Sequence, residues 1–355
     1  MSKNRYGAFI LWGFLALACW GISLAGYWEN RQGNQEFTLY YDSPVFTGKE
    51  MELFIQEREE EGLPSVAAWK ETEKESFTGN TGLVRQGSLL EVSGDMKTLF
   101  SRQLIRGNFP WKEDCQGCVI SQGLSQELFG TDYGTGNEIQ IRGKTYLVRG
   151  ILKSEENFLA LWAEEGEGLE NFHLSYDTDL EPVSQAEEFL YQMTGTEPET
   201  VFEGNFYGAL ARFFLFLPLL TGCLLGGIRS FGAARRQKER GRKILCYILS
   251  VLFLFLFLWG LGKSVRLSPD YFPSMWSDLS FYPKLMEEKA AVFRELMGRK
   301  LCQADSFILK GTVRTVLLAF AGLFFELLAF TAWSSKVGWH FASTVHRIRI
   351  KEKRI

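Results

Sequence analysis

The chain has 355 residues, 46% of them hydrophobic, and its 39 Lys and Arg nearly balance 42 Asp and Glu for a net charge of −3. The near-neutral total hides a strong segregation, because residues 29–205 carry 14 Lys and Arg against 33 Asp and Glu, a net −19, and the remainder carries +16. The basic clusters lie beside long apolar runs, where membrane topology explains them, so nucleic-acid binding is not supported. The length favours about two domains.

The first apolar run, residues 7–27, contains no charged residue and is long enough to span a bilayer. A cleaved signal peptide is the alternative, because Lys3 and Arg5 precede the run and Ala16-Leu17-Ala18 resembles a cleavage site. The run exceeds the usual signal-peptide core of about 7 to 15 residues, which favours a retained helix.

The acidic segment 29–205 alternates irregularly between strand-like and helix-like patterns, which predicts an α+β domain. Thr47 and Glu50 have the spacing of a capping box, at the start of a helix that Gly62 can end. Another helix is expected over 121–130, ending on glycine. The other expected elements are strands over 37–42, 65–76, 118–121, 158–163 and 172–178, a pair of β segments within 83–94, and helices over 95–104 and 184–195.

Cys115 and Cys118 form a single C-x-x-C. A redox motif is expected at a helix N-terminus, but Cys118 begins an apolar strand. Zinc would need two further ligands where this segment offers only His173, and Cys302 stands alone in a later loop. The pair is expected to be either a tight local disulfide or two free thiols, and no metal site is predicted.

The triplet Gly143-Lys144-Thr145 ends the phosphate-binding loop of ATPases, but its surroundings exclude that interpretation. Glu138 stands where the motif needs its first glycine, and β-branched and aromatic residues follow where a helix should begin. Apolar alternation over 138–152 instead predicts a β-hairpin that reverses at Gly143. No ATPase motif is found in the sequence, and no cofactor is predicted.

Three further apolar runs follow, at 207–228, 244–262 and 313–333. The segment 229–243 has seven Lys and Arg and one acidic residue, and 336–355 has six and one. Because positive residues favour the cytoplasmic side, both termini and 229–243 are predicted to be cytoplasmic, with 29–205 outside. The chain is therefore expected to be a multi-pass protein of the cell membrane, in contact with lipid.

These patterns predict an α+β extracytoplasmic domain on a four-helix transmembrane body. In the outer loop, Met286, Ala290, Phe293 and Met297 share one helical face, which is expected to pack on the domain or lie at the membrane interface. The predicted divisions are the N-terminus and first span (1–28), the domain (29–205), the second span (206–228), a basic loop (229–243), the third span (244–262), the outer loop (263–311), the fourth span (312–334) and a basic tail (335–355).

Glu326 is the one acidic residue deep within a predicted span. Intramembrane carboxylates are often functional. A protonated residue in a helix contact is the alternative, because the nearest basic residues in spans, Arg212 and Arg314, lie near span ends. Both interpretations remain open.

Residues 106–152 contain four pieces in a fixed order: the turn Gly107-Asn108-Phe109, the strand at 118–121, the helix at 125–130 and the hairpin at 136–151. In order and spacing they resemble the extracytoplasmic core domain of MacB-like, FtsX-type ABC transporter permeases. The plan of the chain, with one span, a large domain and three more spans, is also similar to that family. In sequence the resemblance is strong only in the domain.

The resemblance implies a cytoplasmic coupling helix that docks on an ATPase subunit. The implied coupling residues are Lys238, Glu239, Arg240, Arg242, Lys243 and Ile244. The sequence departs from the family pattern at Lys243, where an acidic residue is usual, and at Leu245, where glycine is usual, and the final R-A-L-G is absent. A charge reversal would change the surface that such a helix prefers. The alternative is that this loop is a positive-inside anchor.

The resemblance therefore implies a non-enzymatic permease subunit whose partners are a separate ABC ATPase and a second permease chain, identical or different. The alternative is a membrane-anchored accessory or sensor subunit that has lost ATPase coupling. A membrane enzyme is disfavoured, because His173, His340 and His346 are scattered and neither G-x-S-x-G nor H-E-x-x-H occurs.

Overall fold

The computed structural model describes residues 3–30, 35–57, 64–100, 104–176, 182–273, 275 and 278–352, with side chains from 7 to 332 except at position 55. Gly62, the expected end of a helix, lies outside these residues. The chain divides into two compact units. The helical unit comprises Met1–Gln32, Phe206–Leu267 and Ile308–Ile355, and the α/β unit comprises Gly33–Asn205 and Ser268–Phe307.

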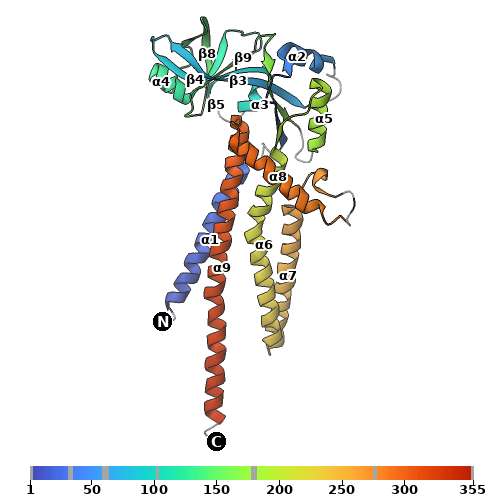
Figure 1. Ribbon diagram of the computed structural model, residues 1–355. Coiled ribbons are helices and arrows are strands. Elements are labelled where there is room, and N and C mark those ends of the chain that lie inside the picture. Colours follow the sequence, from blue (N-terminus) through green and yellow to red (C-terminus); the bar gives the residue numbers. More distant parts are fainter. Residues whose placement is uncertain are drawn as a thin grey trace. The chain divides into compact units, whose positions relative to one another are not determined.

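The α/β unit is a mixed structure of one large sheet, one small sheet and short helices (Figure 1). Its strands are β1 (Glu36–Tyr40), β2 (Phe46–Thr47), β3 (Ser65–Gly79), β4 (Val84–Gly94), β5 (Leu104–Gly107), β6 (Gly117–Ser121), β7 (Glu138–Ile141), β8 (Lys144–Leu152), β9 (Phe158–Trp162), β10 (Gly168–Leu169), β11 (Asn171–Ser175) and β12 (Thr200–Glu203). Its helices are α2 (Gly48–Glu57), α3 (Met96–Phe100), α4 (Gln122–Phe129), α5 (Val183–Thr194), the 3-10 helix η3 (Pro269–Tyr271) and α8 (Phe281–Gly298).

The large sheet has ten strands in the order β12-β1-β11-β3-β4-β9-β6-β8-β5, with β7 paired to both β3 and β8. Because β7 joins these two strands, the strands β3, β4, β9, β6, β8 and β7 form a closed circuit, a small barrel. The β4–β9 and β6–β8 pairs are parallel and the other pairs are antiparallel. Strand β3 contributes to both the open sheet and the barrel, and its register shifts between Thr72 and Glu75, where Lys74 has a positive φ of 60°.

The hairpin predicted over 138–152 is confirmed as β7 and β8. The two residues between the strands, Arg142 and Gly143, both have positive φ, 46° and 80°, which is the conformation of a two-residue hairpin turn. The predicted pair of β segments within 83–94 is wrong, because these residues form the single strand β4. Pairing of Gly87 with Glu75 of β3, next to the register shift, keeps this glycine in the strand despite its poor strand propensity.

Two helix starts follow from local side-chain chemistry. The capping box is confirmed: Thr47 donates its backbone N–H to Glu50 Oε2 (2.9 Å), and Glu50 donates its own to Thr47 Oγ1 (3.3 Å). Ser121 caps α4, since its Oγ accepts from Leu124 N, and Gly130 ends that helix with φ 69°. Ser121 Oγ also accepts from Phe158 N at the start of β9, so one buried hydroxyl fixes both a helix and a strand.

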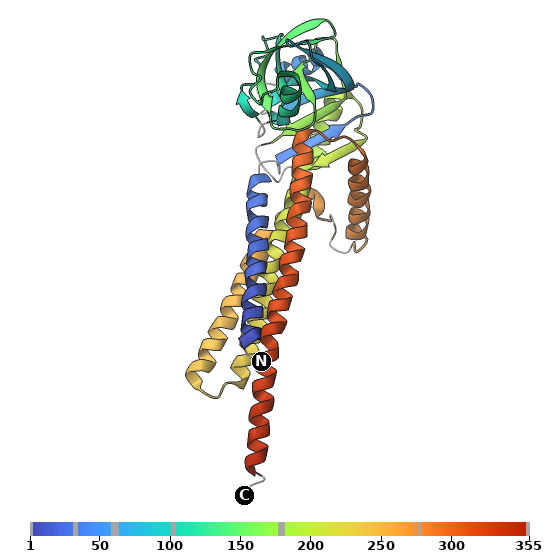
Figure 2. The same ribbon diagram turned by 90° about the vertical axis from the view of Figure 1, so that its left-hand side faces the viewer.

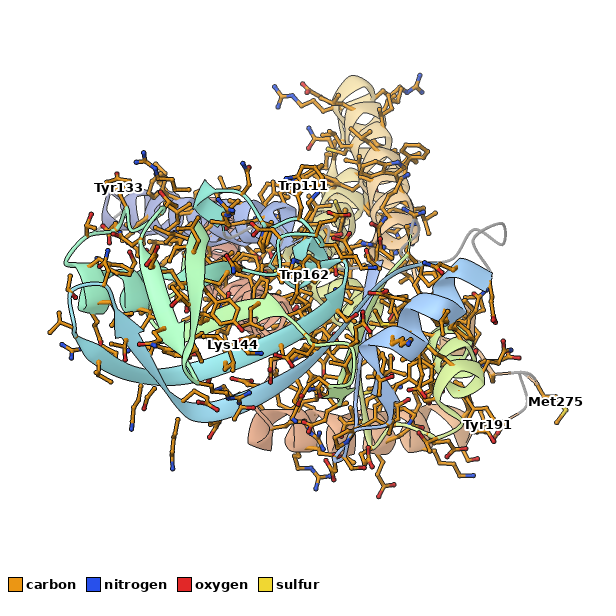
Figure 3. All side chains as sticks on the ribbon, turned by 90° about the horizontal axis from the view of Figure 1, so that it is seen from above. Trp111, Tyr133, Lys144, Trp162, Tyr191 and Met275 are labelled. Carbon is orange, nitrogen blue, oxygen red and sulfur yellow. The ribbon has the colours of Figure 1, made fainter. Side chains whose placement is uncertain are left out.

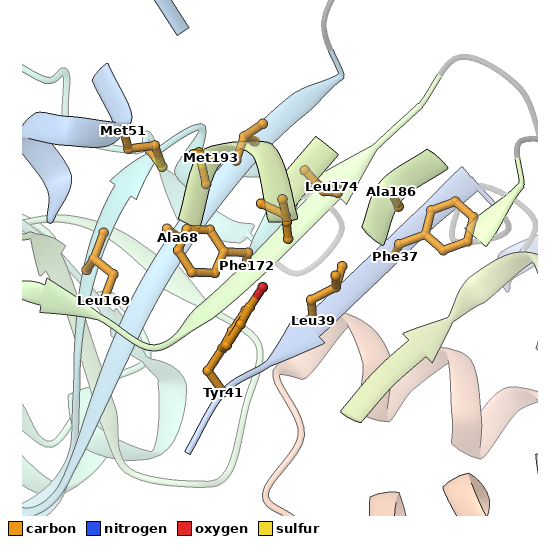
Figure 4. Close-up of a cluster of buried hydrophobic side chains, with 12 residues drawn as sticks. Phe37, Leu39, Tyr41, Met51, Ala68, Leu169, Phe172, Leu174, Ala186 and Met193 are labelled. Atoms are coloured by element: carbon orange, nitrogen blue, oxygen red, sulfur yellow. The ribbon is translucent and has the colours of Figure 1, made fainter. Parts of the chain in front are cut away.

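The open sheet is covered by α2 and α5 over one apolar cluster (Figure 4). Alternation along β1 directs Phe37 and Leu39 into this cluster, where they meet Phe172 of β11 and Leu190 of α5. A second cluster fills the barrel, with Phe77, Leu89, Cys118, Ile120, Ile139, Leu159 and Leu161 among its members. Each half of the unit therefore has a core of its own.

The segment after η3 contributes α8, which contacts β12 within the α/β unit. Met286 and Met297 are 67% and 64% exposed, whereas Leu296 is 1% exposed, so the expected face does not pack on the domain, and its location at the membrane interface stays a prediction. The buried side is one position away, and it includes Lys289, whose ammonium pairs with Glu203 of β12 at 2.6 Å. The Lys289–Glu203 ion pair thus lies on the buried side of α8, and hydrophobicity alone does not indicate this side.

The helical unit contains α1 (Lys3–Asn30), α6 (Gly204–Arg236), α7 (Arg240–Ser264) and most of α9 (Gln303–Glu352). All four have stretches long and apolar enough to cross a membrane. Figures 1 and 2 show α6 and α7 as a helical hairpin. The helix α6 contacts each of the other three, since Leu215 O accepts from Trp20 Nε1 of α1, Gly227 O from Ser250 Oγ of α7, and Thr221 bonds to α9.

Two glycines with positive φ allow a test of the pairing between β5 and β8. A Cβ at Gly107 (φ 79°) would lie 2.0 Å from the Arg149 carbonyl oxygen, whereas a Cβ at Gly130 (φ 69°) would meet nothing within 4 Å. Gly130→Ala should therefore cost only the left-handed backbone penalty of about 1–2 kcal/mol, and Gly107→Ala clearly more. Thermal unfolding of the detergent-solubilised chain measures both. Equal losses of stability in the two variants would contradict the close approach of β5 and β8.

Candidate functional site

The predicted coupling residues surround the turn between α6 and α7. Only three residues, 237–239, separate these helices, and Glu239 is the N-cap residue of α7. Glu239 and Arg242 form an ion pair at 2.9 Å, with side chains 67% and 74% exposed. The other predicted residues, Lys238, Arg240, Lys243 and Ile244, are exposed as well. The turn therefore presents a basic surface, but no separate coupling helix lies between α6 and α7.

Glu326 of α9 lies against α6. Its Oε2 accepts a hydrogen bond from Thr221 Oγ1 at 2.9 Å, and a Cβ added at Gly222 would lie 2.6 Å from its Oε1. The absence of a side chain at Gly222 thus makes room for the carboxyl group. Glu326 therefore takes part in a contact between α9 and α6, and its role in transport stays a prediction.

Cys115 and Cys118 are free thiols in this structure, one exposed and one in the barrel core. Burial and the nearby Asp114 carboxylate raise the pKa of the Cys118 thiol well above its usual range, so this thiol is unreactive. Cys115 lies in the loop before β6, which is fixed by a 2.9 Å hydrogen bond from Trp162 Nε1 to the Trp111 carbonyl; Figure 3 labels both tryptophans. Of the two alternatives expected for the pair, the structure contains free thiols.

A buried polar cluster lies on the face of β1 opposite the apolar core. Glu36, Thr38 and Tyr40 occupy alternate positions of β1, and each is 9% exposed or less. Thr38 is directly opposite His173 of β11 in the strand register. Cys302 and Asp305, at the start of α9 and still within the α/β unit, cover this face.

The cluster is connected by hydrogen bonds through the Asp305 carboxylate. Thr38 Oγ1 donates to Asp305 Oδ1 (2.9 Å), and Tyr40 OH donates to Asp305 Oδ2 (2.7 Å). Tyr40 OH in turn accepts from the Cys302 backbone N–H (3.2 Å), and Cys302 Sγ accepts from Asp305 N (3.4 Å). These bonds fasten the first turn of α9 to β1.

His173 is fully buried and only partly satisfied. Its Nδ1 lies 2.9 Å from Thr38 Oγ1, and because the Thr38 proton goes to Asp305, Nδ1 must be the nitrogen that carries hydrogen. Its Nε2 then has a free lone pair, has no hydrogen-bond partner, and faces Glu36 Oε2 at 3.9 Å. Burial lowers the pKa of His173 to about 4, so the imidazole is neutral at physiological pH.

A cavity of about 490 Å³ opens beside this cluster within the α/β unit. Trp69, Phe100 and Phe158 form part of its wall, and Cys302 reaches it from the cluster. At the same wall the Lys300 ammonium pairs with Glu71 at 2.5 Å and Glu73 at 3.4 Å. The cavity thus joins the polar cluster to an acidic surface.

Sequence reasoning missed this cluster. It treated Cys302 as solitary and His173 as having too few neighbours for a metal site, whereas the fold brings both next to Asp305. Alternation of Glu36, Thr38 and Tyr40 with apolar residues gave no usable signal, because in an antiparallel strand it normally indicates a polar face open to solvent. The residues that meet it lie about 265 positions later in the chain, and nothing local indicates them.

No protein-family model matches the sequence, and no curated protein matches it. Solved structures with a similar fold include the periplasmic region of MacB from Actinobacillus actinomycetemcomitans, at 10% identity over 48% of this chain and 89% of that one, with a TM-score of 0.41. They also include the extracellular domain of the ABC-type transporter YknZ from Gram-positive bacteria (16% identity, 46% and 96% covered, TM-score 0.37). A domain of a Porphyromonas gingivalis protein described as a permease is similar too (13%, 46% and 85%, TM-score 0.35). Each match covers a little under half of this chain.

The polar cluster can be tested with neighbouring tyrosines. Tyr40→Phe removes a hydroxyl that serves both Asp305 and the Cys302 N–H, so it should destabilise the chain by about 1–3 kcal/mol. The control Tyr41→Phe removes only a 3.4 Å bond to the Thr196 carbonyl and should cost less than about 1 kcal/mol. Denaturant unfolding of the solubilised chain gives both values, and a neutral Tyr40→Phe would mean that the hydroxyl is dispensable.

Proposed function

We propose that this chain is the permease subunit of an ABC-type transporter or a related mechanotransmission complex, in which a separate ATPase acts through the membrane helices on the α/β unit. The observation that carries the proposal is the ordered resemblance of residues 106–152 to MacB-like permease domains. In this chain those residues form strand β6, helix α4 and the hairpin β7–β8, which together build half of the barrel.

The connections of the α/β unit support transmission between membrane and domain. Strand β12 ends at Glu203 and α6 begins at Gly204, so no flexible residue separates the sheet from an apolar helix. The first turn of α9 is bonded to β1 through Asp305, and α9 continues as another apolar helix. These two connections along the chain are the routes by which we expect motion of the membrane helices to reach the sheet.

We propose that the exposed basic turn at 238–244 is the ATPase-coupling surface and that it lies in the cytoplasm. A second permease chain, identical or different, completes the complex, as the resemblance implies. Glu326 then serves as an interhelical contact within the membrane, bound to Thr221. The chain itself performs no ATP hydrolysis in this proposal.

A second candidate function is an accessory or sensor subunit that has lost ATPase coupling. It is favoured by Lys243 and Leu245, which depart from the family pattern, and by the direct start of α7 at Arg240. A coupling helix needs residues between α6 and α7 that this chain does not have.

A pull-down distinguishes the two functions. Glu239, Arg240 and Arg242 are changed together to Ala in the full chain, and mass spectrometry identifies the proteins recovered with it. A control variant changes Lys97, Glu188 and Arg294 to Ala, which removes the same charges from exposed positions of the α/β unit. Under the permease proposal an ABC ATPase is recovered with the native chain and the control but falls at least about tenfold with the triple variant, as loss of a charged docking surface would cause. Recovery of membrane proteins alone, unchanged in the variant, would favour the accessory subunit.

The proposed orientation predicts how thiols react in intact protoplasts. A membrane-impermeant maleimide should label exposed Cys115 of the native chain, and labelling should be lost in Cys115→Ser. In that background Lys238→Cys should react only after the membrane is permeabilised. Labelling of Lys238→Cys in intact protoplasts would reverse the assigned topology.

A further inference from the structure

Three potential metal ligands meet in the buried polar cluster of the α/β unit. One imidazole nitrogen of His173, the sulfur of Cys302 and one carboxylate oxygen of Asp305 all lie within 4.8 Å of one another. The three residues come from β11 and from the first turn of α9, and each is at most 9% exposed. Buried groups of this kind normally complete their hydrogen bonds inside the protein.

His173 does not complete its hydrogen bonds. Its side chain is 0% exposed, its Nε2 has no hydrogen-bond partner, and the nearby Glu36 carboxylate is 3.9 Å away, too far for a hydrogen bond. A buried nitrogen lone pair without a partner costs free energy, and a bound cation would satisfy it. The hydrogen bond of Nδ1 to Thr38 also orients the ring as an outer partner of a metal-ligating histidine does.

From these observations we propose that His173, Cys302 and Asp305 bind a divalent transition-metal ion of the zinc type. Nitrogen, sulfur and carboxylate oxygen form a ligand set that zinc uses in proteins, whereas calcium and magnesium require oxygen ligands alone. Bonds of about 2.0–2.3 Å require the ligands to close around the ion from their present spacing.

Binding replaces one proton by the metal. The Cys302 thiol loses its proton to solvent as the sulfur–metal bond forms, so the thiolate and the Asp305 carboxylate together balance the two positive charges of the ion. The proton and the ion can both pass through the 490 Å³ cavity, which Cys302 lines and whose wall includes Glu71 and Glu73.

The consequence for the fold is a metal-dependent connection between β11 and the start of α9. The hydrogen bonds from Thr38 and Tyr40 already hold α9 to β1. The metal adds His173, so that two neighbouring strands are bound to the helix instead of one. This site does not depend on the proposed transport function, since it uses only contacts within the α/β unit.

Cobalt provides the direct test, because a thiolate bound to Co²⁺ gives a charge-transfer absorption in the near ultraviolet. The full chain is purified in detergent, stripped with EDTA and titrated with Co²⁺. We expect the absorption to saturate at one Co²⁺ per chain and to be displaced by Zn²⁺. Cys302→Ser should abolish it, and His173→Ala should weaken Co²⁺ binding by at least about tenfold through loss of a ligand.

Two control variants show whether the signal comes from this site. Cys115→Ser removes an exposed thiol and Cys118→Ser a buried thiol in the barrel, and both should keep the full absorption. Absorption that persists in Cys302→Ser and disappears in Cys115→Ser would overturn the proposal. So would the absence of any cobalt–thiolate absorption in the native chain.

The melting temperature of the native chain tests metal binding even if a variant does not fold. Zn²⁺ that binds only the folded state raises the melting temperature of the EDTA-stripped chain, increasingly with Zn²⁺ concentration. Mg²⁺ at the same concentration should have no such effect. A melting temperature that Zn²⁺ leaves unchanged would mean that the cluster is a hydrogen-bonded contact without a metal.

Discussion

The α/β unit depends on the strand β1, which is buried on both faces. Phe37 and Leu39 enter the apolar core, whereas Thr38 and Tyr40 point to the other side and are no more than 2% exposed. Polar groups buried in this way need partners, and the Asp305 carboxylate supplies them for both. The need to satisfy two hydroxyl groups thus fixes the start of α9 on a strand some 265 residues earlier in the chain.

Strand β1 and its neighbour β12 connect the sheet to the helices α6 and α9. β1 is hydrogen-bonded to β12, which continues without interruption into α6, and its polar face is bonded to the first turn of α9. The Lys289–Glu203 pair adds α8 to β12 near this point.

Local sequence signals predicted much of the fold. The capping box of Thr47 and Glu50, the helix between Ser121 and Gly130 and the hairpin at 138–152 each depend on residues close together in sequence, and each is confirmed. The four long apolar runs correspond to four apolar helices. The barrel and the polar cluster depend instead on pairing across long separations, such as β7 with β3, which no local pattern encodes. Nor does a local pattern show that α8 buries the side that carries Lys289, since Glu203 of β12 pairs with that residue.

Closure of the barrel by β7 has a consequence for how this domain meets other proteins. Among the described strands of the large sheet, β12 and β5 end the strand order, and each is four residues long. The register of β5 is also irregular where it pairs with β8. Short, irregular edges are poor templates for an added strand, so they protect against aggregation and against recognition by strand addition. At these two edges, side-chain surfaces rather than an added strand are therefore expected to select a partner.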